Sequence, residues 1–132
     1  MEIRQGLRYT KDHEWVRVEG AEAVVGITDY AQEQLSDIVY VELPAVGETL
    51  TRGEPCGSVE AVKAVADLYS PITGKVVAVN AALADDPAAV NRSTYDEGWM
   101  LRATLAEPAE LDALLSADDY RKLVSELEGA AG

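Results

Sequence analysis

Short runs of apolar and β-branched residues, separated by turn residues, fill most of the first 105 positions. Residues 7–19 alternate loosely between apolar and polar, which predicts a strand that ends at a turn over Glu19 and Gly20. Residues 21–27 predict a second strand that forms a hairpin with the first. Residues 37–43, rich in β-branched side chains, and residues 99–105 predict two more strands. The pattern therefore indicates a mainly β fold.

Three segments have the caps or spacing of helices. Thr28 is a suitable N-cap for a short helix with Asp29 in its first turn and an end near Ser36. The polar, Ala-rich residues 80–91 predict a loop with one helical turn. Pro108 predicts the first position of a short helix that ends near Leu115.

The last helix is predicted to begin after Ser116, with Asp119 three residues later as a variant capping box. Gly129 is predicted to stop it. One apolar stripe follows the helical spacing and comprises Tyr120, Leu123, Val124 and Leu127. A stripe of this length is more typical of core packing than of a binding groove, so we expect this helix to cap the β core.

The middle of the chain contains an internal repeat. Residues 44–47 and residues 71–74 both have the form Pro-x-x-Gly, at an offset of 27 residues, and each Gly opens an alternating run. Two similar β units predict a flattened barrel or sandwich with approximate two-fold symmetry. The alternative is that two such turns arose independently, because Pro and Gly punctuate most β proteins.

Lys63 lies between the two copies of the repeat. Residues 58–62 and 64–69 read as strands, and no Gly or Pro occurs between Ser58 and Ser70, so a tight turn must place Lys63 at or beside its tip. An amine held in solvent on a rigid hairpin is poorly placed for a buried catalytic base and well placed for a covalent attachment. The alternative is an ordinary solvated lysine, since lysine is almost always exposed.

Composition limits the classes of function. A chain of 132 residues predicts one domain, with a β core over about 7–105 and a helical cap over about 108–129. The net charge of −13, from 24 acidic and 11 basic residues, disfavours nucleic-acid binding, which needs clusters of Lys and Arg. The same charge suits steering towards basic surfaces.

The single cysteine, Cys56, excludes an intrachain disulfide, and with one histidine the chain has no evident Cys/His metal cluster. No apolar run has membrane length, and no signal peptide is visible. We therefore expect a bacterial or archaeal cytoplasm, with a mature organelle protein as the alternative.

Several motifs together resemble the glycine cleavage system H protein family, from about Tyr9 to about Leu105, and the C-terminal helical segment fits too. The HEWV stretch at 13–16 and the GITDYA stretch at 26–31 distinguish this family from other lipoyl domains. The motifs continue with Val59-Glu60-x-Val62-Lys63-Ala64, Ser70-Pro71-x-x-Gly74 and Gly98-Trp99. Biotin carriers have Met beside the lysine, whereas Val62 and Ala64 stand here. The resemblance implies a lipoyl/biotinyl-carrier-like fold.

The resemblance also implies a function. Lys63 would carry lipoate in amide linkage. Glu60, three residues before the lysine, is a candidate recognition point for the lipoate-attaching enzyme, and the alternative is an ordinary solvated carboxylate on a strand. The protein would be a non-catalytic carrier of the aminomethyl group. Its other partners would be a pyridoxal-phosphate glycine decarboxylase, a tetrahydrofolate-dependent aminomethyltransferase and a dihydrolipoyl dehydrogenase. The chain departs from the family at Ala61, where Ser is usual, and at Ser36, where Gly is usual; Ala61 could slow attachment.

The loaded arm carries an amine that needs protection from water. We hypothesise that Asp12, Glu14 and Asp67 hold this amine while Trp15 or neighbouring apolar residues exclude water. The alternative is that all three are ordinary surface acids. His13, the only histidine, is predicted to be structural rather than catalytic.

Two other functions stay open at this point. One is a lipoyl-carrying relative that donates lipoyl groups to 2-oxo acid dehydrogenase complexes. The other is an unmodified β interaction module whose lysine carries nothing. Modification of Lys63 separates a carrier from a module.

Overall fold

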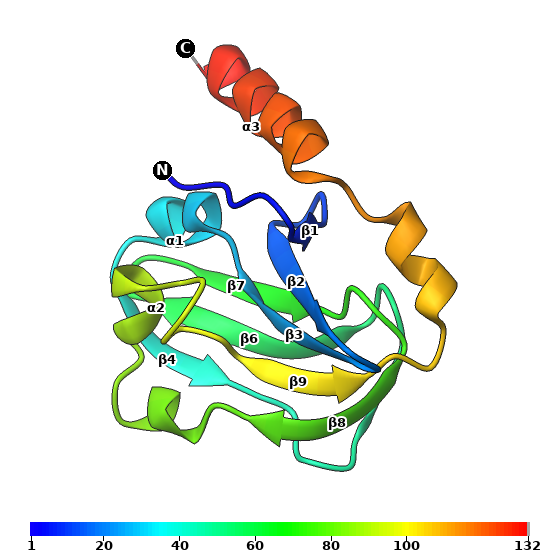
Figure 1. Ribbon diagram of the computed structural model, residues 1–132. Coiled ribbons are helices and arrows are strands. Elements are labelled where there is room, and N and C mark those ends of the chain that lie inside the picture. The colour runs from blue at the N-terminus through cyan, green and yellow to red at the C-terminus, as the bar shows by residue number, and fades with distance from the viewer. Residues whose placement is uncertain (132) are drawn as a thin grey trace.

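The computed structural model describes residues 1–131, with side chains up to residue 129. Its strands form two sheets (Figure 1). The larger sheet has the order β1 (Arg8–Tyr9), β2 (Glu14–Glu19), β3 (Glu22–Ile27), β9 (Leu101–Thr104), β8 (Gly74–Val79) and β5 (Thr49–Leu50). The smaller sheet has the order β4 (Ile38–Glu42), β6 (Pro55–Ala61) and β7 (Val65–Tyr69). The predicted sandwich is therefore confirmed in its open form, as two sheets rather than one closed barrel.

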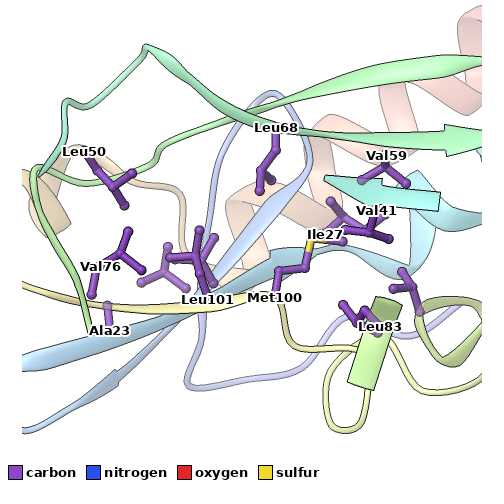
Figure 2. Packing of buried hydrophobic residues seen from close by; sticks show 14 of the residues in the cluster. Ala23, Ile27, Val41, Leu50, Val59, Leu68, Val76, Leu83, Met100 and Leu101 are labelled. Carbon is purple, nitrogen blue, oxygen red and sulfur yellow. The ribbon is translucent and has the colours of Figure 1, made fainter. Parts of the chain in front are cut away.

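The main core fills the space between the sheets. Leu68 and Val59 of the smaller sheet face Leu101 of the larger one and Met100, the residue just before β9 (Figure 2). All four side chains are buried. In the smaller sheet, the strand neighbours of Leu68 and Val59 point outward, because successive side chains alternate between the faces of a sheet. One buried face explains the hydrophobic alternation of the smaller sheet, whereas β2 and β3 of the larger sheet are buried on both faces, with Val16 and Val25 in the main core and Trp15 and Val24 in a second cluster.

The first predicted strand is interrupted. Residues 7–19 form β1 and β2, and between them the chain makes a turn in which the amide of Thr10 donates to the carbonyl of Glu14. His13 in this turn has φ of +70°, a left-handed conformation that a continuous strand does not contain. The hairpin of β2 and β3 forms as predicted, with Gly20 at φ of +63° in its turn.

The repeat has a structural counterpart. Its two copies pair with each other antiparallel, and Thr49 lies opposite Lys75. At the 27-residue offset, Thr49 corresponds to Val76 and Lys75 corresponds to Glu48. The amide of Val76 donates to the carbonyl of Glu48 at 2.9 Å, so the two equivalent pairs are adjacent in the same ladder. The same offset relates β4 to β7, which flank β6 on its two sides. Local two-fold symmetry therefore relates these strands.

The short helices mostly follow their predicted caps. Helix α1 (Asp29–Leu35) is capped by Thr28, whose side chain accepts from the amide of Ala31 at 3.2 Å. Ser36 ends the helix at φ of +63°, a conformation that favours Gly. Residues 80–91 hold the 3₁₀ turn η1 (Ala81–Ala84) and most of α2 (Ala89–Arg92), where one helical turn is predicted. Pro108 opens a 3₁₀ helix, η2 (Pro108–Ala113).

The last helix, α3 (Ala117–Ala131), begins as predicted, with the amide of Asp119 donating to the Ser116 hydroxyl at 3.2 Å. It does not stop at Gly129, because an exposed glycine lowers helix propensity without breaking the hydrogen-bond ladder. Nor does it cover the core between the sheets. It lies beside the N-terminal segment (Figure 1). Its buried residues join a second cluster comprising Leu7, Tyr9, Trp15, Val24, Tyr95, Ala117, Tyr120 and Val124.

Candidate functional site

Lys63 is the middle residue of the three-residue connection between β6 and β7. The amide of Ala61 donates to the carbonyl of Ala64 at 2.7 Å, which closes the turn around Val62 and Lys63. Both residues are exposed, and neither has a positive φ. The amide of Val62 donates to the carbonyl of Asp37 at 3.1 Å, so the turn is also fastened to the start of β4. The predicted hairpin tip is therefore present and held rigidly by backbone contacts.

The strand pattern before the turn places Glu60 on the outer face of the smaller sheet. Val59 and Ala61 of β6 are buried in the core, so Glu60 between them faces outward. Glu60 lies opposite Tyr40 on one side and Val65 on the other. Among the residues with described side chains, nothing forms an ion pair with Lys63 or Glu60. Both are free to meet a partner.

A cavity of about 340 Å³ lies at the other end of β7. Backbone hydrogen bonds bring its distant parts together: Gly53 donates to Ser70 at 2.8 Å, and Tyr9 donates to Leu115 at 2.8 Å. Its lining comprises Tyr9, Thr10, Lys11, Asp12, Glu14, Arg52, Gly53, Tyr69, Ser70, Pro71, Ala113, Leu114 and Leu115.

Glu14 is the buried acid of this cavity, with 2% of its surface exposed. Its Oε1 accepts from the hydroxyl of Thr10 at 2.5 Å, and its Oε2 accepts from the amide of Tyr69 at 3.4 Å. Burial raises the pKa of Glu14 to about 7, although the Thr10 hydrogen bond acts in the opposite direction. Near neutral pH this carboxyl group can therefore take up or release a proton in response to a nearby charge.

The cavity also has cations at its opening. Lys11 and Arg52 are exposed, as is Asp12. Solvent and salt screen these exposed charges more than they screen the buried Glu14. The interior of the cavity is consequently the part where a negative charge would act most strongly on a bound cation.

The three acids of the arm hypothesis do not share one cavity. Asp12 and Glu14 lie together, as predicted, but Asp67 lines a separate groove of about 410 Å³ on the outer face of the smaller sheet. Glu42 and Glu48 also line this groove. Asp67 occupies the middle of β7, between Lys63 and Tyr69, whose amide contacts Glu14. Strand β7 thus leads from the lysine, past Asp67, to the buried carboxyl group.

Trp15 does not take the role expected of it. Its ring is fully buried in the second cluster, where Nε1 donates to the carbonyl of Thr94 at 3.1 Å. The ring fills the space above Gly26, where an added Cβ would lie 2.7 Å from it. Side chains of adjacent residues point to opposite faces of a strand, so Trp15 turns away from Glu14. Pro71, Leu114 and Leu115 supply the apolar walls instead.

His13 has a structural position. Its Nδ1 is hydrogen-bonded to the hydroxyl of Tyr120 at 2.8 Å, and burial lowers the pKa of His13. Tyr120 in turn shares a hydrogen bond of 2.7 Å with Thr28. His13 therefore joins the interrupted strand to α3 and to the cap of α1.

Sequence reasoning missed Thr10 and the walls from residues 113–115. The only local signal for Thr10 is a hydroxyl residue four positions before Glu14, within a turn. Leu114 and Leu115 have no local signal, because they reach the cavity from more than 100 positions away in the chain.

The described part of the chain shows no group of three or more His, Cys, Asp or Glu side chains placed to hold a metal ion. Cys56 is partly buried against the main core, and burial raises the pKa of its thiol to about 12, so its reactive thiolate is scarce. Within residues 1–131, no helix has the length and apolar character needed to cross a membrane.

Comparisons with known proteins converge on one family. The family model described as glycine cleavage H-protein matches residues 7–127. The glycine cleavage system H protein of Listeria innocua is 54% identical over 122 residues, covering 92% of this chain and 98% of that one. The corresponding protein of Brevibacillus brevis is 55% identical over 126 residues, covering 96% of this chain and 100% of that one. A crystal structure of a glycine cleavage system H protein from Mycobacterium marinum superposes with a TM-score of 0.82 at 40% identity, covering 93% of this chain and 99% of that one.

Proposed function

The chain belongs to the glycine cleavage H-protein family, and from this premise we propose that it is the carrier of the aminomethyl group, with lipoate attached to Lys63. The observation that carries the proposal is the position of Lys63, exposed in the tight turn between β6 and β7 that backbone hydrogen bonds hold in place. Such a position fits an amide-linked arm, because the amine is accessible and its support is rigid.

The protein itself supplies attachment, positioning and protection. Lipoate, when bound, supplies a disulfide that is reduced and reoxidised as the cargo is taken up and released. Lys63 provides the amine to which its carboxyl group is joined. Glu60, three positions earlier and exposed on the same hairpin, is proposed as a recognition point for the lipoate-attaching enzyme.

The family places the chain among the other enzymes of the glycine cleavage system. We infer that a pyridoxal-phosphate glycine decarboxylase loads the aminomethyl group and a tetrahydrofolate-dependent aminomethyltransferase removes it. A dihydrolipoyl dehydrogenase then restores the disulfide. The cytoplasmic location stays a prediction.

The proposal is tested by intact mass after incubation with lipoate and a lipoate ligase. We expect the wild type to gain one lipoyl group and Lys63→Arg to gain none. Lipoylated protein should then support exchange of labelled bicarbonate into glycine by the decarboxylase, which a lipoyl donor to 2-oxo acid dehydrogenase complexes need not do. If the wild type gains no mass, Ala61→Ser tests whether position 61 blocks that ligase; no gain in either protein rejects the carrier function.

We further propose that the amine of the cargo is held by Glu14 in the cavity. The protonated amine of the cargo is a cation that favours ionisation of the Glu14 carboxyl group, which then forms a charge-assisted hydrogen bond with it. Pro71, Leu114 and Leu115 limit the access of water to this contact. Asp67 and Asp12 have exposed positions, the first on the path along β7 and the second at the opening of the cavity.

Single substitutions test the contribution of each acid to retention of the aminomethyl group. We expect Glu14→Gln to speed the loss of the aminomethyl group from loaded protein about tenfold, because it removes a charge-assisted bond in a buried place. Asp12→Asn and Asp67→Asn should have smaller effects, since exposed charges interact weakly. The measurement is release of labelled formaldehyde and ammonia over time. An unchanged rate in Glu14→Gln would contradict the role of the cavity.

A further inference from the structure

Thr10 makes more contacts with Glu14 than the turn between β1 and β2 requires. The backbone alone closes this turn, since the amide of Thr10 donates to the carbonyl of Glu14 at 3.0 Å. The side chain of Thr10 adds two contacts. Its Oγ1 accepts from the amide of Glu14 at 3.1 Å, and its hydroxyl donates to Oε1 of Glu14 at 2.5 Å. The turn therefore does not depend on the contact between the hydroxyl and the carboxyl group.

The direction of the Thr10 hydroxyl follows from its two partners. A backbone amide can only donate, so Oγ1 is the acceptor in its contact with the amide of Glu14. The one proton of the hydroxyl is then left for Oε1 of Glu14. Thr10 is half-buried in the cavity wall, and the carboxyl group it contacts is buried. A donor directed at a buried carboxyl group favours its ionised form, because little water is present to solvate the charge.

The carboxyl group of Glu14 keeps capacity for another donor. An ionised carboxylate can accept about four hydrogen bonds. Among the described residues, Thr10 and the amide of Tyr69 supply two, and the second of these is long, at 3.4 Å to Oε2. An ammonium group in the cavity can therefore bind Glu14 without displacing Thr10.

We propose that Thr10 is a positioning residue for retention of the aminomethyl group: its hydroxyl orients Glu14 and favours the ionised carboxylate that binds the protonated amine. This inference rests on the proposed role of Glu14 in holding the cargo. Without the hydroxyl, Glu14 would keep its proton to higher pH and would offer the amine a neutral acceptor. A neutral acceptor binds a cation less strongly than a carboxylate does.

The ionisable groups around Glu14 come from the same turn and from the elements packed against it. They comprise Tyr9, Lys11, Asp12, His13, Arg52, Cys56, Tyr69 and Tyr120. Burial raises the pKa values of the cysteine, Tyr9 and Tyr120 and lowers that of the histidine, so these four are neutral near neutral pH. The charge of Asp12 opposes ionisation of Glu14. Within the described part of the chain, the Thr10 hydroxyl is the one side-chain group that donates to Glu14.

The first test is the titration of Glu14 in the full, unlipoylated chain, followed by NMR of its carboxyl carbon. We expect Thr10→Val to move the midpoint upward by about one pH unit, because it removes a hydrogen bond to a charged group. Thr10→Ser keeps the hydroxyl and should match the wild type. Thr10→Ala removes the same group with a smaller side chain and replaces Thr10→Val if that variant does not fold.

Thr104→Val is the matched control for the titration. Thr104 is also half-buried, and its hydroxyl oxygen also accepts from a backbone amide, that of Lys75, at 3.0 Å. It lies on β9, outside the lining of the cavity. Its substitution removes a comparable local contact and should leave the Glu14 midpoint unchanged.

The second test is retention of the cargo by loaded protein at several pH values on both sides of neutrality. The release rate of Thr10→Val is divided by that of the wild type at each pH. We expect this ratio to peak at about two to three near neutral pH, where Glu14 is more ionised in the wild type than in the variant. It should approach one at acidic pH, where both carboxyl groups are protonated, and at alkaline pH, where both are ionised. A ratio that does not change with pH would show that Thr10 only supports the structure, and would overturn the inference.

A double variant tests whether Thr10 acts through Glu14. Glu14→Gln has no carboxylate to ionise, so adding Thr10→Val should not speed release further. An increase as large as that in the wild-type background would reject the inference.

The outcomes also separate this inference from the proposed function. An unchanged release rate in Glu14→Gln would mean that the proposed cargo site itself fails. If Glu14→Gln speeds release while Thr10→Val shifts neither the titration nor the pH dependence of release, the cargo site stands and the role of Thr10 is rejected.

Discussion

At the scale of single residues, burial changes the acidity of Glu14 without removing it from the cavity wall. Thr10 and the amide of Tyr69 donate to its two oxygens, so the carboxyl group is oriented even when it is protonated. The exposed Asp12 and Asp67 lack such supports among the described side chains. A carboxyl group with a pKa near 7 responds to a cation by releasing its proton, which gives Glu14 a property that surface acids do not have.

Glu14 should also leave a signature in stability. The folded protein holds a proton on Glu14 that the unfolded chain releases, because burial raises the pKa from 4.5 to about 7. The stability that this provides is complete below about pH 4.5 and is lost as the pH rises through about 7. The free energy of unfolding of the wild type, relative to Glu14→Gln, should fall by up to about 3 kcal/mol across that window.

Urea unfolding at several pH values measures this difference. Glu60→Gln is the matched control, since Glu60 is an exposed acid on a strand. Parallel stability curves for the wild type and Glu14→Gln would mean that Glu14 is not perturbed by burial.

At the scale of elements, α3 is joined to the rest of the chain through aromatic contacts as well as its apolar stripe. Tyr120 stacks on Tyr9 with ring centroids 4.6 Å apart, and its hydroxyl meets both His13 and Thr28. Three elements therefore converge on one side chain: the turn before β2, the cap of α1, and α3. The same convergence fixes Leu115 against Tyr9 and so holds one wall of the cavity.

Tyr120→Phe should test this junction. The substitution keeps the stacked ring and removes the hydrogen bonds to His13 and Thr28, which leaves Nδ1 of His13 without its partner and the Thr28 hydroxyl with only the amide of Ala31. We expect the free energy of unfolding to fall by about 1–3 kcal/mol. Tyr40→Phe, a change at an exposed tyrosine, should stay within about 0.5 kcal/mol of the wild type. Denaturant unfolding of both variants provides the comparison, and equal stabilities would show that the hydroxyl does not hold the junction.

At the scale of the whole molecule, the two sheets and the surplus of acids have separate consequences. The sandwich places Lys63 at one end of β7 and the Glu14 cavity at the other, so one strand connects the proposed attachment residue to the cavity proposed to hold the cargo. The net charge of −13 gives the surface a negative field. Such a field favours partners with basic docking surfaces. The rate of association with these partners should fall as salt increases, because salt screens the attraction.

Local sequence determined much of this protein. The alternation of apolar residues, the cap at Thr28 and the offset Pro-x-x-Gly turns predicted most strands, helix α1 and the hairpin that exposes Lys63. These features depend on neighbours within a few positions, so their physical causes are visible in the sequence. The motifs also sufficed to indicate the family, which the comparisons confirm.

Tertiary structure alone decided the cavity. Its lining comes from four separate segments, around residues 9–14, 52–53, 69–71 and 113–115, and backbone hydrogen bonds between distant strands and loops hold them together. The burial of Glu14, the outward position of Asp67 and the turn at His13 depend on these long-range contacts. Desolvation of a carboxyl group is set by whatever packs around it, and residues far apart in the chain supply that packing. The sequence therefore singled out the lysine, whereas only the fold shows which of the three acids is buried.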